Sequence, residues 1–183
     1  KYLKEENLTI VPKSDSLCDK SIQDIIDLDE GKEVEFKSSL RYCLKEKSAK
    51  DYIENSVFKN IAAFLNTSGG VLLVGVEDNR SIIGLEETDY LTFKKPDKKD
   101  EFLKHFDNLL GSRLGDAYNS LVNISIETID GKKIAKICVK KKASAPVFLK
   151  QKGKDEEFYI RRSASAFKLT AMELIKYTTE NWN

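Results

Sequence analysis

The sequence has few of the residues that cross-link small domains through disulfides or bind zinc. Its 183 residues include three cysteines, Cys18, Cys43 and Cys138, and one histidine, His105. No CxxC pair is present, so the sequence indicates neither a disulfide framework nor a zinc site. We interpret the cysteines as reduced cytoplasmic thiols. His105 lies in a helical pattern, where a packed or solvated ring is expected rather than a catalytic base.

Long apolar runs and a leader segment are also missing. No uninterrupted apolar stretch approaches the roughly 20 residues of a membrane helix, and no charged and then apolar leader precedes the first structured pattern. We therefore expect no membrane partner and a cytoplasmic location. The chain begins at Lys1 without a methionine, so we expect it to be part of a longer protein.

The net charge is small, but the charges are unevenly placed. The chain has 31 basic and 30 acidic side chains, which gives a formal charge of +1. Residues 131–162 hold eleven lysines and arginines against three acids, whereas Ser21–Glu35 holds six carboxylates and one lysine. Because an average hides such separation, the small net charge does not exclude a nucleic-acid partner.

Hydropathy patterns predict several short strands. Glu33–Leu40 alternates as a half-buried strand does, and Val71–Val76 is a continuous apolar run typical of a strand covered on both faces. Asp130-Gly131 is a strong hairpin signal between two alternating segments. The remaining predicted strands are Ile82–Leu85 as a partner of Val71–Val76, Leu121–Thr128 and Lys133–Val139 around Asp130-Gly131, and edge strands Pro146–Lys150 and Glu157–Arg162.

Three helices are predicted among these strands. The first starts with Ser48 as N-cap and stops at Gly69, the second covers Lys98–Leu110 and is closed by Gly111, and the third follows a capping box from Thr170 to Glu173. The third helix is expected to bury Leu174 and Ile175, with Tyr177 or Thr178.

The irregular mixture of strands and helices predicts an α+β fold, with a mixed or antiparallel sheet and about three helices packed on it. No internal repeat is present. We expect an N-terminal extension over residues 1–20 and one domain over residues 21–183.

Candidate site residues lie on the first strand. Glu35 and Lys37 are two residues apart and so share one strand face, and Glu30 lies at the approach to the strand. Carboxylates with a lysine suit metal-assisted phosphodiester cleavage, because the carboxylates hold Mg²⁺ or Mn²⁺ and the ammonium steadies charge on the phosphate. The alternative is an ordinary surface, where Glu35 and Lys37 pair with cross-strand neighbours.

A second carboxylate follows the buried strand. Asp78 comes directly after Val71–Val76, and the end of a central strand can hold a side chain that is both exposed and rigidly supported. The alternative is that Asp78 only forms a turn with Asn79.

The basic segment supplies candidate phosphate contacts. They are Lys140, Lys141, Lys142, Lys150, Lys152, Lys154, Arg161 and Arg162. Arg161 and Arg162 are favoured because the guanidinium fork suits phosphate, whereas lysines at strand edges also serve to prevent aggregation. Three interspersed aromatic residues, Phe148, Phe158 and Tyr159, are expected in the core rather than as stacking platforms.

The order and spacing of several short motifs carry a family resemblance. The motifs are Glu30 five residues before Glu35-Phe36-Lys37, the run NTSGGVLLVGVED over residues 66–78 followed by Gly84, Pro146-Val147, and FYIRRS over residues 158–163. Together they resemble the Schlafen AlbA-like domain, a family found as a DNA-binding module of bacterial proteins and as the nuclease core of animal Schlafen proteins. The resemblance runs from about Asp24 to the last helix.

This resemblance implies an α+β fold and nucleic acid as partner. In Schlafen members that cut tRNA or rRNA, three acids form a metal-dependent site, which implies Glu30, Glu35 and Asp78 here as catalytic ligands of Mg²⁺ or Mn²⁺. Glu33 is an alternative to Glu30. Animal Schlafen cores pair two such halves around a groove, so a groove here requires a homodimer.

ATP is not expected as a ligand. The sequence has no GxxxxGK[ST] motif, so the lysine-bearing phosphate cradle is missing. Gly69-Gly70 is more simply explained as a helix end that lets the next strand pass close by.

Three functions remain open at this point. The first is a nucleic-acid-binding domain that is also a metal-dependent endoribonuclease of structured RNA such as tRNA. In this hypothesis Glu30, Glu35, Lys37 and Asp78 are catalytic, and Lys37, Lys140, Lys141, Lys142, Arg161 and Arg162 contact the nucleic acid. The second is a non-catalytic DNA-binding module of a longer transcriptional regulator or defence protein. The third is a protein-interaction or dimerisation domain.

Overall fold

The centre of the molecule is a four-stranded mixed sheet. The computed structural model describes residues 16–140 and 143–182. The sheet order is β1-β4-β6-β5, with β1 over Val34–Lys37, β4 over Gly70–Val74, β5 over Val122–Ile129 and β6 over Lys132–Val139. Strand β1 runs parallel to β4, and the other two neighbouring pairs are antiparallel. The α+β fold and the mixed sheet are thus confirmed.

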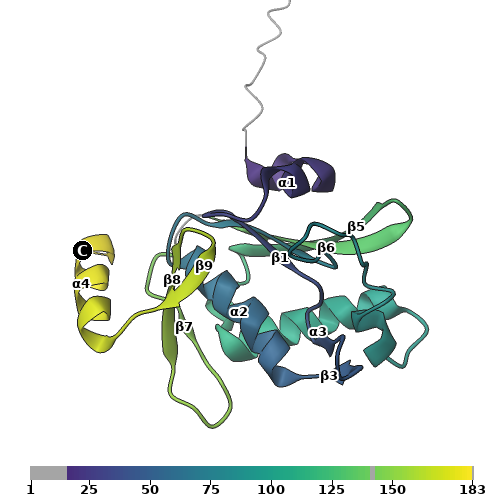
Figure 1. The fold of residues 1–183 in the computed structure, drawn as a ribbon. Helices are drawn as coiled ribbons and strands as arrows, with labels where there is room; N and C mark the ends of the chain where they lie inside the picture. Colours follow the sequence, from purple (N-terminus) through teal and green to yellow (C-terminus); the bar gives the residue numbers. More distant parts are fainter. Residues whose placement is uncertain (1–15, 141–142, 183) are drawn as a thin grey trace, which may run out of the picture.

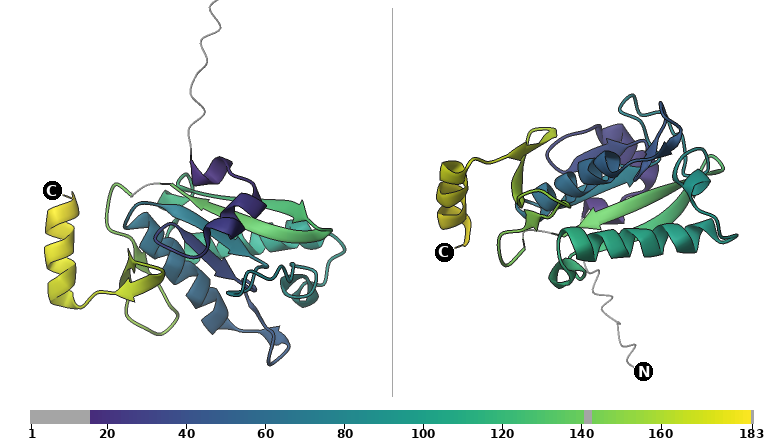
Figure 2. Two further views of the ribbon diagram at one scale, coloured as in Figure 1. Left: turned by 45° about the horizontal axis from the view of Figure 1, so that its top comes forward. Right: turned by 90° about the horizontal axis from the view of Figure 1, so that it is seen from below.

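Helices cover both faces of this sheet. Helix α1 (Ile22–Leu28) lies on one face, and helices α2 (Asp51–Leu65) and α3 (Lys98–Arg113) lie on the other (Figure 1; Figure 2). The alternation of strand side chains divides the apolar residues between the two faces. In β4, for example, Val71 and Leu73 pack under α1, whereas Leu72 and Val74 pack against α2 and α3.

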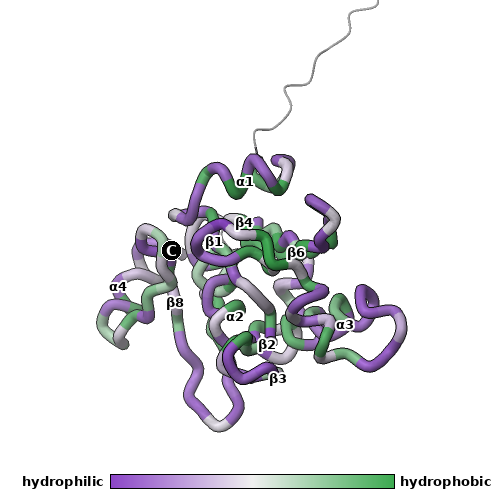
Figure 3. Tube along the Cα trace, turned by 45° about the vertical axis from the view of Figure 1, so that its right-hand side comes forward, coloured by the Kyte–Doolittle hydropathy of each residue, from purple (hydrophilic) through white to green (hydrophobic). Residues whose placement is uncertain are grey.

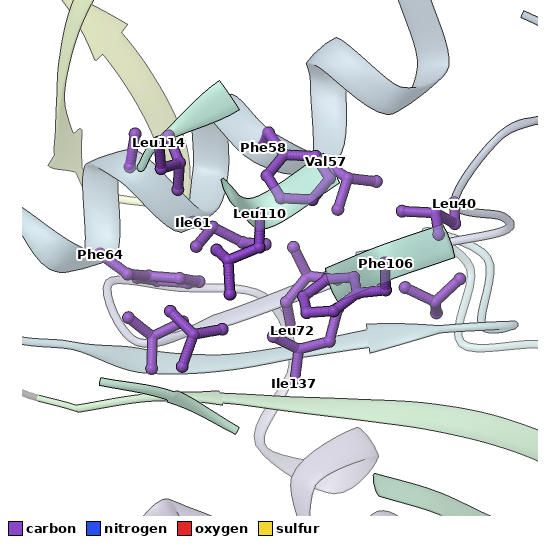
Figure 4. Packing of buried hydrophobic residues seen from close by; sticks show 14 of the residues in the cluster. Leu40, Val57, Phe58, Ile61, Phe64, Leu72, Phe106, Leu110, Leu114 and Ile137 are labelled. Carbon is purple, nitrogen blue, oxygen red and sulfur yellow. The ribbon is translucent and has the colours of Figure 1, made fainter. Parts of the chain in front are cut away.

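The larger core lies between the sheet and the two long helices. Phe58 of α2 stacks on Phe106 of α3 with ring centroids 5.5 Å apart, and both rings are fully buried above Leu72 and Ile137 of the sheet (Figure 4). The tube in Figure 3 shows the same gathering of apolar chain in the central strands. This packing fixes α2 over the sheet, and α2 carries one of the site residues described below.

A second, smaller sheet stands beside the first. It is formed by β7 (Phe148–Leu149), β8 (Glu157–Arg162) and β9 (Ser165–Lys168) in that order, and helix α4 (Ala171–Trp182) packs on it (Figure 1). Phe158 and Ile160 form the cluster between β8 and α4, together with Leu169. The shorter elements are 3-10 helices η1 (Leu17–Asp19), η2 (Asp89–Thr92) and η3 (Asp116–Tyr118), and the hairpin of β2 (Tyr42–Cys43) and β3 (Ser48–Ala49).

Two local predictions are confirmed in detail. Strands β5 and β6 form a hairpin around Asp130 and Gly131, whose φ angles of 51° and 78° are those of the primed turns that suit a twisted hairpin. Thr170 and Glu173 form the predicted capping box at the start of α4.

Other local predictions are wrong. Ser48 pairs with Cys43 in a hairpin that was not predicted, so α2 begins only after Lys50. Helix α3 continues through Gly111 to Arg113, because Gly115, at φ 107°, supplies the residue with positive φ after the helix.

The remaining differences concern one buried position and the extent of several short elements. Ile175 is 61% exposed rather than buried, since α4 turns Leu174 and Tyr177 towards the small sheet. The segment Ile82–Leu85 makes one bridge, from Ile82 to Val76, and no strand. Helix α1 and strand β9 were not predicted.

The N-terminal part of the described chain packs on the main sheet. Leu17 and Cys18 of η1 join the cluster beneath α1, and the predicted boundary after residue 20 falls between η1 and α1. No helix within residues 16–140 and 143–182 combines the length and the apolar character needed to cross a membrane.

Candidate functional site

Glu35 is a buried carboxylate in the first strand of the main sheet. Its neighbours Val34 and Phe36 point into the apolar cluster under α1, so the alternation of the strand turns Glu35 to the opposite face, towards α2. Glu35 is 6% exposed. A buried carboxylate is costly unless it is paired and hydrogen-bonded, so its partners define the site.

Three side chains surround the Glu35 carboxylate. Lys37 Nζ donates a hydrogen bond to Oε1 at 2.5 Å, and Asn60 Nδ2 of α2 donates to the same oxygen at 3.1 Å. Arg161 Nη2 of β8 lies 2.7 Å from Oε2. We call Glu35, Lys37, Asn60 and Arg161 the Glu35 cluster. It joins three elements that are far apart in the sequence.

Arg161 acts as the anchor of this cluster. Its side chain is 1% exposed, and its guanidinium donates to the carbonyl oxygens of Gly31 at 2.7 Å and Val34 at 3.0 Å, and to Asn60 Oδ1 at 2.7 Å. Because the N–H groups of Nη2 point to those carbonyls, Glu35 Oε2 receives no hydrogen bond despite the short ion pair. Arg161 therefore ties β8 to the main sheet and does not present its guanidinium to solvent.

Glu30 and Asp78 lie next to the Glu35 cluster. Glu30 Oε1 accepts a hydrogen bond from the Phe36 amide at 2.8 Å. Burial raises the pKa of Glu30, and the negative charges of Glu35 and Asp78 raise it further. Asp78 is exposed and follows β4, whose end lies beside the end of β1 because the two strands are parallel. The structure thus brings four predicted residues close enough for their charges to interact: Glu30, Glu35, Lys37 and Asp78.

The arrangement of these carboxylates does not fit a divalent metal ion as it stands. Within residues 16–140 and 143–182, no three His, Cys, Asp or Glu side chains are placed to hold a metal together. Glu35 already has two cations beside it, and the free Oε2 lies against the Arg161 guanidinium. A metal bound there would meet a fixed positive charge, which raises its energy.

The other predicted residues lie elsewhere. Lys140 and Glu33 line a cleft of about 690 Å³ beside η1, together with Ser68 and Lys136, on the sheet face opposite to Glu35. Arg162 is exposed and lies on the small sheet, 3.9 Å from Glu173. Lys141 and Lys142 fall outside the described residues.

The glycine turn after α2 has a structural role. Gly69 has φ 77°, and a Cβ there would lie 2.5 Å from the Val139 carbonyl oxygen. The turn also follows the C-terminus of α2, where the helix dipole is negative and disfavours phosphate. These two features support the interpretation of Gly69-Gly70 as a close crossing between the helix end and strand β6.

The sequence predictions did not include Asn60. Its signal is a polar residue within the apolar stripe of α2, next to Ile61 and three residues from Val57, which indicates a buried polar contact. The partner could not be read from that signal, because Arg161 lies 101 residues further along the chain. His105 is packed, as expected: its Nε2 lies 2.8 Å from Glu54 Oε1 and its ring meets Phe93 edge to face.

Comparisons with known proteins identify a family and a shared fold. The family model described as Schlafen, AlbA_2 matches residues 30–170, and no curated protein matches the sequence. The crystal structure of the DIP2311 protein from Corynebacterium diphtheriae is similar with a TM-score of 0.53 at 19% identity, over 83% of this chain and 24% of that one. This chain therefore spans about a quarter of the length of DIP2311.

A second solved structure is the N-terminal domain of a RecG-related protein from Nitrosomonas europaea, studied by solution NMR. It aligns with 82% of this chain and 94% of its own, at 22% identity and a TM-score of 0.49.

Proposed function

The chain belongs to the Schlafen AlbA_2 family, and we propose that it is a nucleic-acid-binding domain that contacts a phosphate through Lys37. The observation that carries the proposal is the Glu35 cluster, in which a buried carboxylate held by Arg161 positions a partly exposed lysine. Buried polar networks are costly, so one that joins a buried ion pair to a partly exposed cation is a candidate functional site.

Lys37 is suited to hold a phosphate oxygen. Its ammonium group has three donors, of which one reaches Glu35 Oε1 and another the Phe36 carbonyl oxygen at 2.7 Å. The Lys37 side chain is 21% exposed. The remaining donor is therefore available to a phosphate, and its direction is set in advance by the two internal bonds.

The charge balance of the cluster also supports an anionic ligand. Glu35 carries one negative charge, while Lys37 and Arg161 carry two positive ones. The four side chains of the cluster therefore carry a net charge of +1, and Lys37 is the more exposed of the two cations. The carboxylates of Glu30 and Asp78 border the cluster and repel an anion, so this surface attracts a phosphate only where Lys37 holds it directly.

A matched pair of variants tests this contact. Lys37→Gln removes the surface cation but leaves Glu35 paired with Arg161, and Lys94→Gln removes an exposed lysine away from the cluster. We expect Lys37→Gln to weaken binding of labelled tRNA, single-stranded RNA and duplex DNA, and to lower the slope of log K against log salt by about 1. Equal affinities and slopes for the two variants, measured by fluorescence anisotropy, would contradict the contact.

A second candidate is metal-dependent cleavage of structured RNA such as tRNA. The observation that favours it is the raised pKa of Glu30, caused first by burial and then by Glu35 and Asp78, since carboxylates that repel one another can be relieved by Mg²⁺ or Mn²⁺. This candidate requires the Glu35 carboxylate to leave the Arg161 guanidinium when the metal binds.

Cleavage is tested by incubating the domain and its Asp78→Asn variant with the same nucleic acids, in Mn²⁺ or in EDTA. Metal-dependent products that Asp78→Asn abolishes support the nuclease. Salt-dependent binding without products supports the binding module of a longer regulator or defence protein. If the domain binds none of the three nucleic acids at low salt, both the nuclease and the binding module are rejected, and a protein-interaction domain is favoured. Light scattering on the same samples tests the predicted homodimer.

A further inference from the structure

An exposed aromatic ring and an arginine lie stacked on the small sheet, away from the Glu35 cluster. The Arg162 guanidinium lies over the Phe167 ring, with Cζ 3.9 Å from the ring centroid. The Phe167 residue is 39% exposed, and the Arg162 side chain is 50% exposed. We call Arg162 and Phe167 the Arg162 platform. It offers solvent a flat guanidinium supported by a ring.

The hairpin geometry explains why these two residues meet. In the β8–β9 pair, Arg162 is opposite Ser165 and Phe167 is opposite Ile160, so Arg162 and Phe167 are diagonal neighbours on one face. Two residues close the hairpin, and one of them, Ser163, has a φ of 49°. This tight turn leaves the platform little freedom to change shape.

Two contacts outside the hairpin position the platform. On the other face of β8, Arg161 is bonded to the main sheet, so the strand that carries Arg162 is anchored. Glu173 Oε1 of α4 lies 3.9 Å from Arg162 Nη2. The guanidinium is therefore positioned by the ring on one side and by α4 at its edge.

A small groove opens beside the platform. It has a volume of about 310 Å³, lies between β8 and α4, and is lined by Ile160, Arg162, Leu169, Tyr177 and Lys176 along with the carboxylates Glu173 and Glu180. Its volume is at the lower end of the range for pockets that take small organic ligands. The two carboxylates disfavour a phosphate in the groove, whereas an uncharged planar group meets apolar and cationic walls.

We propose that the Arg162 platform stacks an unpaired nucleobase, which makes single-stranded or looped nucleic acid the preferred partner of this domain. This inference rests on the proposed nucleic-acid binding. Aromatic rings and arginine planes are surfaces on which proteins stack the splayed bases of single strands. The platform supplies both in one stack, so the base lies on the free face of the guanidinium.

The alternative is that the pair only stabilises the hairpin. An exposed cation–π pair contributes little to stability, and that role needs no nucleic acid. The two roles differ in one respect, because a stacking platform is sensitive to the presence of bases and a hairpin contact is not.

The experiment compares two labelled strands of equal length by fluorescence anisotropy: oligouridine, and the same strand with abasic residues at its central positions. The variants are Phe167→Leu, which keeps an apolar side chain without the ring, and Arg162→Lys, which keeps the charge without the plane. Tyr52→Leu is the control, since it removes another exposed aromatic residue.

We expect Phe167→Leu and Arg162→Lys to weaken binding of oligouridine by roughly 5- to 150-fold, the range for loss of one stacked base. Their salt dependence should match the wild type, because no phosphate contact is lost. On the abasic strand the wild type should fall to the affinity of the variants, while Tyr52→Leu should follow the wild type on both strands.

Four results overturn the inference. If Phe167→Leu binds oligouridine as tightly as the wild type does, the platform does not stack a base. The same holds if the variant loses equal affinity for the oligouridine and the abasic strand. If the wild type binds both strands equally with a normal salt slope, nucleic-acid binding stands and the platform alone is rejected. If the wild type binds neither strand nor tRNA nor duplex DNA, the proposed function fails and the platform fails with it. Circular dichroism of each variant verifies the fold.

Discussion

Removing the buried arginine of the Glu35 cluster should destabilise the whole domain. We consider Arg161→Leu, which retains an apolar side chain of similar reach and deletes the guanidinium. The change removes the guanidinium donor of the Gly31 carbonyl oxygen and one of the two donors to the Val34 carbonyl oxygen, which keeps the Gly31 amide. Glu35 is then left buried with Lys37 as its one remaining cation. It also removes the guanidinium from over the Phe64 ring, where Cζ lies 4.8 Å from the centroid.

The expected cost is about 3 to 5 kcal/mol, the range for breaking a buried ion pair from one side. That is a large share of the roughly 5 to 15 kcal/mol by which a domain is stable. At a typical urea slope of about 2 kcal/mol per M, the midpoint falls by about 2 M. Unfolding can be followed by circular dichroism and by the fluorescence of Trp182, the single tryptophan. Its ring packs against the Phe158 ring, with the two centroids 6.3 Å apart.

The neighbouring arginine is the control. Arg162→Leu makes the same chemical change one residue away, where the side chain is 50% exposed, and should cost less than about 1 kcal/mol. Combining Glu35→Gln with Arg161→Leu should cost less than the sum of the two single changes, with a coupling of about 0.5 to 3 kcal/mol, because the pair interacts directly. A cost within 1 kcal/mol for Arg161→Leu, or strict additivity in the cycle, refutes the role of Arg161 as an anchor.

Two further predictions concern a buried acid and a glycine. Burial raises the pKa of Asp89 to about 6 from 3.8, so the folded state binds the extra proton and stability should fall by roughly 3 kcal/mol as the pH rises from about 4 to about 6. Urea midpoints of the wild type should fall as the pH rises across this interval, and those of Asp89→Asn should change less with pH. An equal dependence on pH in the two proteins contradicts the raised pKa of Asp89. Gly69→Ala places a Cβ 2.5 Å from the Val139 carbonyl oxygen at φ 77°, whereas Gly153→Ala has φ 70° and nothing within 4 Å. Both variants carry the left-handed strain of about 1 to 2 kcal/mol, and Gly69→Ala has the clash in addition. Urea unfolding should therefore show a clearly larger loss of unfolding free energy for Gly69→Ala, and equal losses would exclude the clash.

The elements that the sequence predicted well are those that depend on neighbouring residues. The β5–β6 hairpin follows from alternation on both sides of Asp130-Gly131, and the start of α4 follows from the reciprocal bonds of Thr170 and Glu173. Both signals lie within a few residues of the structure they specify, so no distant contact is needed to form them.

Two of the misplaced elements show local signals that other contacts overrule. Gly111 looks like a helix end, yet α3 passes through it because Leu110 and Leu114 are buried against the main core. Ser48 looks like an N-cap, yet its backbone pairs with Cys43 in the hairpin of the two short strands β2 and β3. At Gly111 tertiary packing outweighs a local preference of about 1 kcal/mol, and at Ser48 a competing local hairpin replaces an N-cap preference of similar size.

The candidate site shows the same division. Alternation placed Glu35 and Lys37 on one strand face, and the parallel pairing of β1 with β4 brings Asp78 near them. Whether that face is solvent or interior could not be read from β1, because it depends on the return of β8 more than a hundred residues later.

The packing of β8 beside β1 also separates the roles of the adjacent residues Arg161 and Arg162. Both match the family motif and both suit phosphate, so the same role was predicted for both. In β8 successive side chains point to opposite faces, and the face towards β1 and α2 takes Arg161 into the Glu35 cluster, while the face towards α4 leaves Arg162 in solvent on the Phe167 ring. If this division is right, Arg161→Leu lowers stability far more than it alters the choice between base-bearing and abasic strands, and Arg162→Lys does the reverse.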